Sequence, residues 1–356
     1  MALYWSWAWG DETSTQLADE MGWVRSDTNT SRIAPRSDVV YTYPGSPTRY
    51  SLGTTAARYV NTPASAWLQS GWVCVPIFAT TGFSGNEAWN LVASYGNANS
   101  IQVYISNTTT GEVTLQLFDN SITRTQISAG TITANDWHYI ALKYDHSLTS
   151  PTAEVWIDGS FRCAGTASWS EAQSTNGVYR SGGFSNAGSL PGGQIGQIVV
   201  YDTGSLSSGN PYDPIYCTRV NPTVDETGVG TFSPSIGADN FAVLDSPFDS
   251  SIFTANTSSN VGDRVVCQSS GALGWYSQLG TTPTVINGLT THVWASGSGQ
   301  SGFAGVSDNN STYDTGSHIT PDTNDPTYGY VTAADQPSDA AVWDTGSLLY
   351  VKYEVS

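Results

Sequence analysis

The strongest constraint on the fold is a succession of short segments in which apolar and polar residues alternate or β-branched and aromatic residues gather. The segment 137–144 (WHYIALKY) is the clearest, because its residues divide into two faces with a period of two. Glycine, asparagine, aspartate and proline collect between such segments, and these residues end strands and build turns. Many short strands of this kind are typical of β-sandwiches. We therefore predict an all-β protein with early strands at 72–79, 89–95, 101–106, 112–118, 137–144, 153–157 and 194–201.

The N-terminal stretch 3–10 (LYWSWAWG) follows the same period, with Leu3, Trp5, Trp7 and Trp9 on one face. It lacks the basic start, the uninterrupted apolar run and the small-residue cleavage site of a secretory signal. We therefore expect this stretch to be a strand of the folded protein.

Composition and charge exclude several classes of partner. The chain has 12 basic and 30 acidic residues, a formal net charge of -18. Nucleic acid and anionic membrane surfaces both need clustered lysine and arginine, so neither is expected to bind. No apolar run approaches the roughly 20 residues that a membrane span requires, so no membrane insertion is expected.

The four cysteines are far apart, without a CxxC motif or a Cys-His cluster, at Cys74, Cys163, Cys217 and Cys267. This spacing does not favour a zinc site. Cys74 lies between two valines and Cys267 follows two valines, which is where a small buried apolar residue belongs. We expect free, buried thiols, although the even number leaves disulfides as an alternative.

The most specific pattern combines a Trp-led strand at 137–145, a strand at 153–159 ending in Asp158-Gly159, and a closing strand at 194–201 of the type Ile-Gly-x-Ile-x-x-Tyr. This pattern resembles the late strands of laminin-G or concanavalin A-like jelly rolls. Asp158-Gly159 supplies the positive φ angles of a tight hairpin. The resemblance implies a jelly roll over 1–208 whose first and last strands meet. Trp5, Trp7 and Trp9 would then lie beside 195–201 and fill the gap between the sheets.

A second region begins where the periodicity lapses. The proline-containing stretch 209–230 is predicted to be a linker or a crossing segment, and 231–356 a smaller C-terminal β-sandwich domain. Its expected strands are 232–244, 261–267, 284–286, 292–295, 340–343 and 348–355.

The stretches 9–12, 49–52, 237–245 and 260–264 resemble structural proteins of tailed bacteriophages, in which such jelly rolls carry a C-terminal β region. The resemblance implies a virion protein on the surface of the tail or the capsid. Its partners would be other virion proteins, and its assembly a homo-oligomer, with a trimer as the symmetry that suits a virion surface.

Catalysis is not expected. Retaining glycosidases of concanavalin A-like fold carry alternating carboxylates about 5 Å apart on one strand. The nearest candidates, Glu154 and Asp158, have Trp156 between them, and Asp158 is better explained as the hairpin residue. The four histidines are isolated, and no Gly-x-Ser-x-Gly, His-Glu-x-x-His or phosphate-loop motif occurs. We therefore predict no catalytic residues.

No metal or cofactor is predicted either. The loops 308–314 and 322–325 are rich in the oxygen ligands that calcium prefers, but they lack the regular acidic spacing of a dedicated loop. Ca²⁺ stays open as an alternative at these loops.

Glycan binding is the additional function that the sequence favours, because sugars stack on aromatic faces and form hydrogen bonds with amide side chains. The candidates are Trp67 with Asn61, and Trp89 with Asn86 and Asn90. Most of the 13 tryptophans of a sandwich must be buried, and the sequence does not say which are exposed.

The predicted function is therefore that of a non-enzymatic virion structural protein, a decoration protein, fibre or adhesin that takes a host-surface glycan as its candidate ligand. Two alternatives remain: a secreted carbohydrate-binding module or adhesin, and a glycoside hydrolase of concanavalin A-like fold.

Overall fold

The computed structural model describes residues 3–7, 24–25, 33–36, 51–54, 59–79, 89–107, 110–119, 123–170, 172–183, 193–202, 211–212, 224–225, 232–234, 265–267, 271–278, 289–295, 302–307, 314–315, 327–333 and 348–355. The chain divides into two compact units. The first comprises Met1–Ala18 and Gly22–Thr218, and the second comprises Asp19–Met21 and Arg219–Ser356. The division after Thr218 falls inside the segment 209–230.

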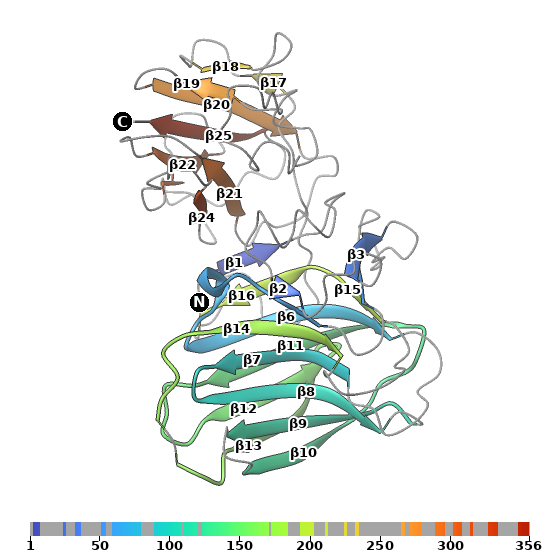
Figure 1. Cartoon of the computed structure of the whole chain (residues 1–356). Coiled ribbons are helices and arrows are strands. Elements are labelled where there is room, and N and C mark those ends of the chain that lie inside the picture. The colour runs from blue at the N-terminus through green and yellow to red at the C-terminus, as the bar shows by residue number, and fades with distance from the viewer. Residues whose placement is uncertain are drawn as a thin grey trace. The chain divides into compact units, whose positions relative to one another are not determined.

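The first unit is an antiparallel β-sandwich, as the sequence predicts, and Figure 1 shows its two sheets facing each other. The described residues of one sheet form nine strands: β13 (Ser160–Thr166), β12 (Thr152–Ile157), β11 (Trp137–Asp145), β6 (Ser70–Ala79), β15 (Gly193–Ile195), β4 (Ser51–Thr54) and β3 (Ile33–Arg36) in that order, with β16 (Ile198–Tyr201) pairing β6 and β1 (Leu3–Trp7) pairing β16. The other sheet has seven described strands in the order β10 (Arg124–Thr131), β9 (Glu112–Asp119), β8 (Asn99–Asn107), β7 (Trp89–Gly96), β14 (Gly177–Gly183), β5 (Tyr59–Asn61) and β2 (Val24–Arg25). A short 3₁₀ turn, η1 (Ala64–Ala66), follows β5.

The seven strands predicted between residues 72 and 201 are confirmed, the last of them split into β15 and β16. Strands β2, β3, β4, β5, β10, β13 and β14 were not predicted. β10 and β13 are mostly exposed on both faces, with the burial patterns of edge strands. An exposed edge strand needs no apolar face, so hydrophobic alternation does not reveal it.

The N-terminal strand closes the nine-stranded sheet. Trp5 pairs with Val200 and Trp7 with Ile198 in the antiparallel ladder between β1 and β16. Both indoles are buried, at 0% and 5% exposure, and their rings stack at 6.2 Å. This confirms the predicted closure for Trp5 and Trp7, while Trp9 lies outside the described residues.

One detail of β1 differs from the prediction. The register shifts between Leu3 and Trp5, so that Leu3 pairs with Tyr201. An irregularity of this kind reverses the side that a residue faces. Leu3 therefore joins Trp72 and Tyr201 in a cluster on the outer face of the sheet rather than sharing the face of the tryptophans.

The core lies between the sheets and consists of aliphatic side chains that alternate along the central strands. They are at most 1% exposed and include Val73, Val75, Ile101, Val103, Leu115, Leu117, Leu142 and Val155. Burying such a side chain contributes about 1.5–3 kcal/mol to folding. The sheets approach closely at Gly165 of β13, where a Cβ atom would lie 2.5 Å from Ile127 Cδ1.

Pro211 and Tyr212 cover part of the outer face of the nine-stranded sheet, over β6, β11 and β12. The Pro211 carbonyl accepts hydrogen bonds from Cys74 Sγ and Tyr139 OH, each at 3.2 Å. Tyr212 stacks on Trp156 with ring centroids 3.9 Å apart. We call these two residues the strap. Part of the segment predicted as a linker or a crossing segment thus packs on the sheet.

The thiols of Cys74 and Cys163 are free and buried, as predicted. Burial raises the pKa of the Cys74 thiol to about 12, which keeps it protonated and unreactive. Cys217 and the side chain of Cys267 lie outside the described residues.

The second unit is also β structure in its described residues. Five strands form one sheet in the order β17 (Val224–Asp225), β20 (Gly271–Gln278), β25 (Leu348–Val355), β22 (Gly302–Ser307) and β23 (Asp314–Thr315), and two strand pairs join β18 (Phe232–Pro234) to β19 (Val265–Cys267) and β21 (Leu289–Ala295) to β24 (Thr327–Ala333). The strands expected at 284–286 and 340–343 lie outside the described residues. Its assembly into a sandwich stays a prediction.

Among the described residues, no helix combines the length and the apolar character that crossing a membrane requires.

Candidate functional site

The outer face of the seven-stranded sheet carries a continuous band of polar and aromatic side chains. On β8 and β9, Ile101 and Leu117 point into the core, so Gln102 and Gln116, which pair with each other, point outward. Gln126 of β10 pairs with Gln116 and extends the row. We call this band the polar strip, and its members on β8, β9 and β10 are Ser100, Gln102, Tyr104, Glu112, Thr114, Gln116, Phe118, Arg124, Gln126 and Ser128.

The middle of the polar strip is packed tightly. Gln102 is 3% and Gln116 is 7% exposed although both point away from the core. Gln102 Nε2 donates to Ser100 Oγ at 3.0 Å, and Gln126 Nε2 donates to Tyr104 OH at 2.6 Å. The buried Oε1 of Gln102 has no hydrogen-bond partner. An amide row held in this way has already lost its side-chain freedom, so binding a ligand costs less entropy.

The phenol of Tyr104 is neutral at physiological pH. Its burial raises the pKa above the ordinary value, and the hydrogen bond from Gln126 and the charge of Arg124 offset only part of that rise. Tyr104 therefore contributes a hydroxyl group that both donates and accepts hydrogen bonds.

Arg180 of β14 continues the strip toward β5. Its guanidinium carbon lies 3.7 Å from the ring centroid of Tyr59 and 4.1 Å from that of Tyr95. Its Nε donates to Asn61 Oδ1 at 2.8 Å. Arginine stacks favourably on aromatic rings, so this arrangement, which we call the arginine clamp, fixes the guanidinium plane.

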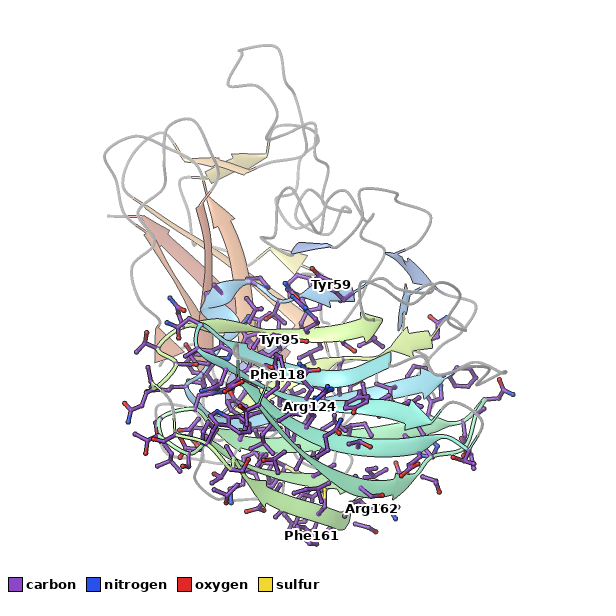
Figure 2. The ribbon with its side chains drawn as sticks, turned by 60° about the horizontal axis from the view of Figure 1, so that its bottom comes forward. Tyr59, Tyr95, Phe118, Arg124, Phe161 and Arg162 are labelled. Carbon is purple, nitrogen blue, oxygen red and sulfur yellow. The ribbon has the colours of Figure 1, made fainter. Side chains whose placement is uncertain are left out.

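The clamp and the glutamine row lie on one line across the sheet. Arg180 pairs with Ala93 of β7, and Ala93 pairs with Gln102 of β8. Figure 2 shows Tyr59, Tyr95, Phe118 and Arg124 along the same face of the sheet. Aromatic rings, amides, hydroxyls and two guanidinium groups thus share one surface.

The sequence predicts Trp67 and Asn61 as a glycan-binding pair, but in the structure their side chains lie in different places. Trp67 is only 7% exposed, and its Nε1 donates to Ser94 Oγ at 3.0 Å inside the sandwich. The expectation of an exposed ring is not met there, because the indole fills the interior beside His146. Asn61 belongs instead to the arginine clamp.

The other predicted pair is only partly described. Trp89 and Asn90 open β7, and the backbone register sets Asn90 opposite Tyr104 of the polar strip. Their side chains and Asn86 lie outside the described residues, so their proposed contact with a glycan stays a prediction.

Polar side chains also meet inside the sandwich, around His146. This ring is 0% exposed, with Nε2 3.0 Å from Ser94 Oγ and Nδ1 hydrogen bonded to Asn99 Oδ1. Burial lowers the pKa of His146 to about 4. Nearby, the hydroxyl groups of Tyr144 and Tyr179 form a hydrogen bond with each other. These groups are closed to solvent, so they stabilise the fold rather than meet a substrate.

The two carboxylates weighed as a catalytic pair have structural partners. Glu154 Oε1 accepts from Lys143 Nζ at 2.9 Å. Asp158 accepts from the backbone N–H of Tyr139 at 2.7 Å and lies 2.8 Å from His138 Nδ1. The φ angles of 52° at Asp158 and 75° at Gly159 confirm the predicted hairpin.

An open groove of about 700 Å³ lies beside the Lys143–Glu154 ion pair, with Ser70, Asp145 and Thr152 among its lining residues. Within the described part of the chain, no cluster of histidine, cysteine and carboxylate side chains could hold a metal ion. The oxygen-rich loops at 308–310 and 322–325 fall outside that part.

The polar strip is not recognisable in the sequence for two reasons. Glutamine and threonine that alternate with isoleucine and leucine look like the ordinary solvent face of a strand. The partners that turn them into a surface, Gln126 and Arg180, lie on strands that hydrophobic periodicity did not reveal. The available signal was the polar residues that alternate with apolar ones in 101–106 and 112–118, Gln102 and Gln116 among them.

No protein-family model matches the chain, and no curated protein matches it. Solved structures do, at low identity. An endo-β-1,4-glucuronan lyase from the fungus Trichoderma reesei is 12% identical, with a TM-score of 0.44 over 60% of this chain and 100% of that one. Domain 4 of AbnA, an extracellular arabinanase from Geobacillus stearothermophilus solved with arabinotriose, is 11% identical, with a TM-score of 0.39 over 56% and 93%.

The receptor-binding domain of botulinum neurotoxin type G is 11% identical, with a TM-score of 0.33. The chain spans 42% of that domain's length, and the match covers 48% of this chain.

Proposed function

We propose that the first unit binds a glycan on the outer face of its seven-stranded sheet and that the protein is a non-enzymatic component of a bacteriophage particle. The observation that carries the binding part is the polar strip continued by the arginine clamp. It joins amide, hydroxyl and aromatic groups in one row across β10, β9, β8, β7 and β14.

A carbohydrate suits this surface because each sugar ring presents hydroxyl groups at its rim and C–H groups on its faces. Gln126 and Ser128, which are exposed, match the rim, and the partly exposed rings of Phe118 and Tyr95 match the faces, while Gln102, Gln116 and Tyr104 are almost fully buried. The strip lies on sheet strands rather than on loops, so its spacing is rigid and regular, as a repeating polymer requires.

The proposal is non-enzymatic because the two carboxylates nearest to a catalytic pair are engaged elsewhere. Glu154 is paired with Lys143, and Asp158 holds the β12–β13 hairpin and the backbone of Tyr139. General acid catalysis would need one of them protonated and facing a sugar.

The location on a virion is supported by the sequence resemblance to tailed-phage structural proteins. In this proposal the protein is displayed on the tail or capsid surface as a decoration protein, fibre or adhesin, together with other virion proteins and as a homo-oligomer. Immunogold labelling of purified particles tests it: labelled virions are expected, and unlabelled particles contradict it.

Glycan binding is tested by screening the whole protein against a panel of bacterial polysaccharides and measuring the affinity for those it retains. Replacing the exposed Gln126 removes one amide and its hydrogen bond to Tyr104. Gln126→Ala is expected to weaken binding about tenfold, the equivalent of about 1.4 kcal/mol.

Ser160→Ala is the control, because Ser160 is exposed on β13 of the other sheet. Its affinity should equal that of the unmodified protein. Equal losses in both variants, or no retained polysaccharide, would contradict the proposed site. Release of reducing ends from a bound polysaccharide would contradict the non-enzymatic assignment.

A further inference from the structure

We infer that the glycan bound by the polar strip is acidic, with carboxylate-bearing sugars at intervals along its chain. This inference rests on the proposed function and adds the ligand class. It follows from the placement of two arginines on a strip with few other charged groups.

Arg180 is held in place by its neighbours but keeps N–H donors for a ligand. Its guanidinium carbon lies over the rings of Tyr59 and Tyr95, and its Nε donates to Asn61. The donors left over are those of the two Nη groups. Among the described side chains no carboxylate forms an ion pair with Arg180.

A guanidinium held in this way is suited to a carboxylate. Its planar edge presents two parallel N–H donors, which match the two oxygens of a carboxylate in a bidentate pair. The neighbouring rings already hold the side chain in place, so binding a ligand costs little further side-chain entropy. A neutral hydroxyl group has a single oxygen, so it does not match the two parallel N–H donors as a carboxylate does.

The second argument is Arg124 at the opposite end of the strip. Arg124 is exposed and pairs with Phe118, which pairs with Ser100, and Ser100 pairs with Tyr95 of the clamp. Four strand spacings separate β10 from β14, which is about 19 Å at about 4.8 Å per strand. One sugar cannot reach both arginines, but a chain with repeated carboxylates can.

The third argument is the local charge. The described charged groups of the strip and the clamp are Arg124, Arg180 and Glu112, so the surface is net positive. The whole chain has a formal net charge of -18. An acidic ligand is attracted at this surface by the two arginines, which makes its binding sensitive to salt and to the loss of either arginine.

The experiment compares charged and neutral forms of the same polymer on the full-length protein. The probes are polygalacturonate, alginate and hyaluronan, each beside its carboxyl-reduced, neutral counterpart, with dextran sulfate as a second anion. At least one uronate polymer is expected to bind about tenfold more tightly than its neutral counterpart, and raising the salt from low to high concentration should weaken it.

Two variants locate the effect. Arg180→Gln and Arg124→Gln are each expected to reduce affinity for the uronate polymer about tenfold, and to reduce affinity for its neutral counterpart by a smaller factor. Lys143→Gln is the control for the loss of a positive charge, because Lys143 lies on β11 of the other sheet and its side chain is 38% exposed. Arg124 is exposed, so its variant stays informative even if loss of Arg180 destabilises the clamp.

The outcomes separate the two proposals. Equal affinity for charged and neutral polymers, with an effect of Gln126→Ala, overturns the acidic ligand and leaves glycan binding in place. Binding to dextran sulfate but to none of the uronates also overturns the carboxylate assignment. Failure to bind any polysaccharide in the wider panel overturns the proposed function and this inference together.

Discussion

Residues that are close in the sequence, or of the same type, have different roles in this protein when they lie in different surroundings. Trp67 and Asn61 are six positions apart, yet the indole is buried at 7% exposure and the amide supports Arg180 on the outer face. His138 and His146 differ in the same way. Burial lowers the pKa of His146, while for His138 the lowering by burial is outweighed by the hydrogen bond and charge of Asp158, so its pKa is raised.

His146 makes the fold sensitive to acid. Its folded-state pKa of about 4 lies below the unfolded value of 6.5, so the unfolded chain takes up the proton first. The stabilising contribution is complete above pH 6.5 and is lost as the pH falls toward 4. The loss is about 3 kcal/mol, at 1.36 kcal/mol per pKa unit. Urea unfolding between pH 7 and pH 4.5 measures it.

His146→Gln removes the titrating group, so its free energy of unfolding should fall less steeply below pH 6.5. His138→Gln is the comparison, because a raised pKa contributes stability at low pH that is lost as the pH rises, the opposite sign. An unchanged acid slope in His146→Gln would rule out this histidine as the cause.

At the scale of elements, the strap is the clearest case of a segment whose role depends on what it covers. Pro211 and Tyr212 follow the end of β16 at Tyr201 by ten and eleven positions, and they cover Cys74, Tyr139 and Trp156 on the outer face of β6, β11 and β12. Two hydrogen bonds to one carbonyl and one ring stack hold them there. The nine-stranded sheet is consequently buried on both faces near β6.

Removing the Tyr212 ring should open this outer face. In Tyr212→Ala, Trp156 loses its stacked partner and the Pro211 carbonyl is held less firmly, so Cys74 becomes accessible more often. Its labelling by an uncharged thiol reagent under native conditions should accelerate by about tenfold or more. Peptide mapping by mass spectrometry assigns the label to each cysteine.

Cys163 provides the internal control, because it is buried on β13 and has no contact with the strap among the described interactions. Its labelling rate should stay the same. A Cys74 rate equal to that of the unmodified protein would show that Tyr212 does not protect the thiol.

At the scale of the whole molecule, the first unit is closed by residues distant in sequence. β1 begins at Leu3, and its partner β16 ends at Tyr201. This closure sets the stacked rings of Trp5 and Trp7 against the interior. The described strands of the second unit form a five-stranded sheet and two separate strand pairs.

Truncating Trp5 tests the closure. Trp5→Ala removes a fully buried indole at the junction of β1 and β16, which should lower the free energy of unfolding by about 3–5 kcal/mol. Chemical denaturation of the full chain, followed by tryptophan fluorescence and circular dichroism, measures the change. Leu148→Ala is the control, since Leu148 is 43% exposed, and its effect should stay within about 0.5 kcal/mol. Similar values for the two variants would mean that β1 contributes little.

Local chemistry was sufficient to predict the strands that have an apolar face. Period-two alternation located β6, β7, β8, β9, β11 and β12, because burial of one face requires apolar residues at every second position. Asp158-Gly159 gave the β12–β13 hairpin, because left-handed backbone angles at both positions favour these residues. The closure of β1 on β16 was also correct, but it rested on a family resemblance.

The sequence by itself thus determined the all-β class, the strands that face the core and the buried thiols of Cys74 and Cys163. Only the tertiary structure decided which polar residues share a surface. Gln102, Gln126 and Arg180 are brought together by strand order, which depends on pairing between distant segments such as β14 and β7, where Arg180 pairs with Ala93. Periodicity reports the faces of a single strand and contains no information about its neighbours, so the polar strip and the arginine clamp required the assembled sheet.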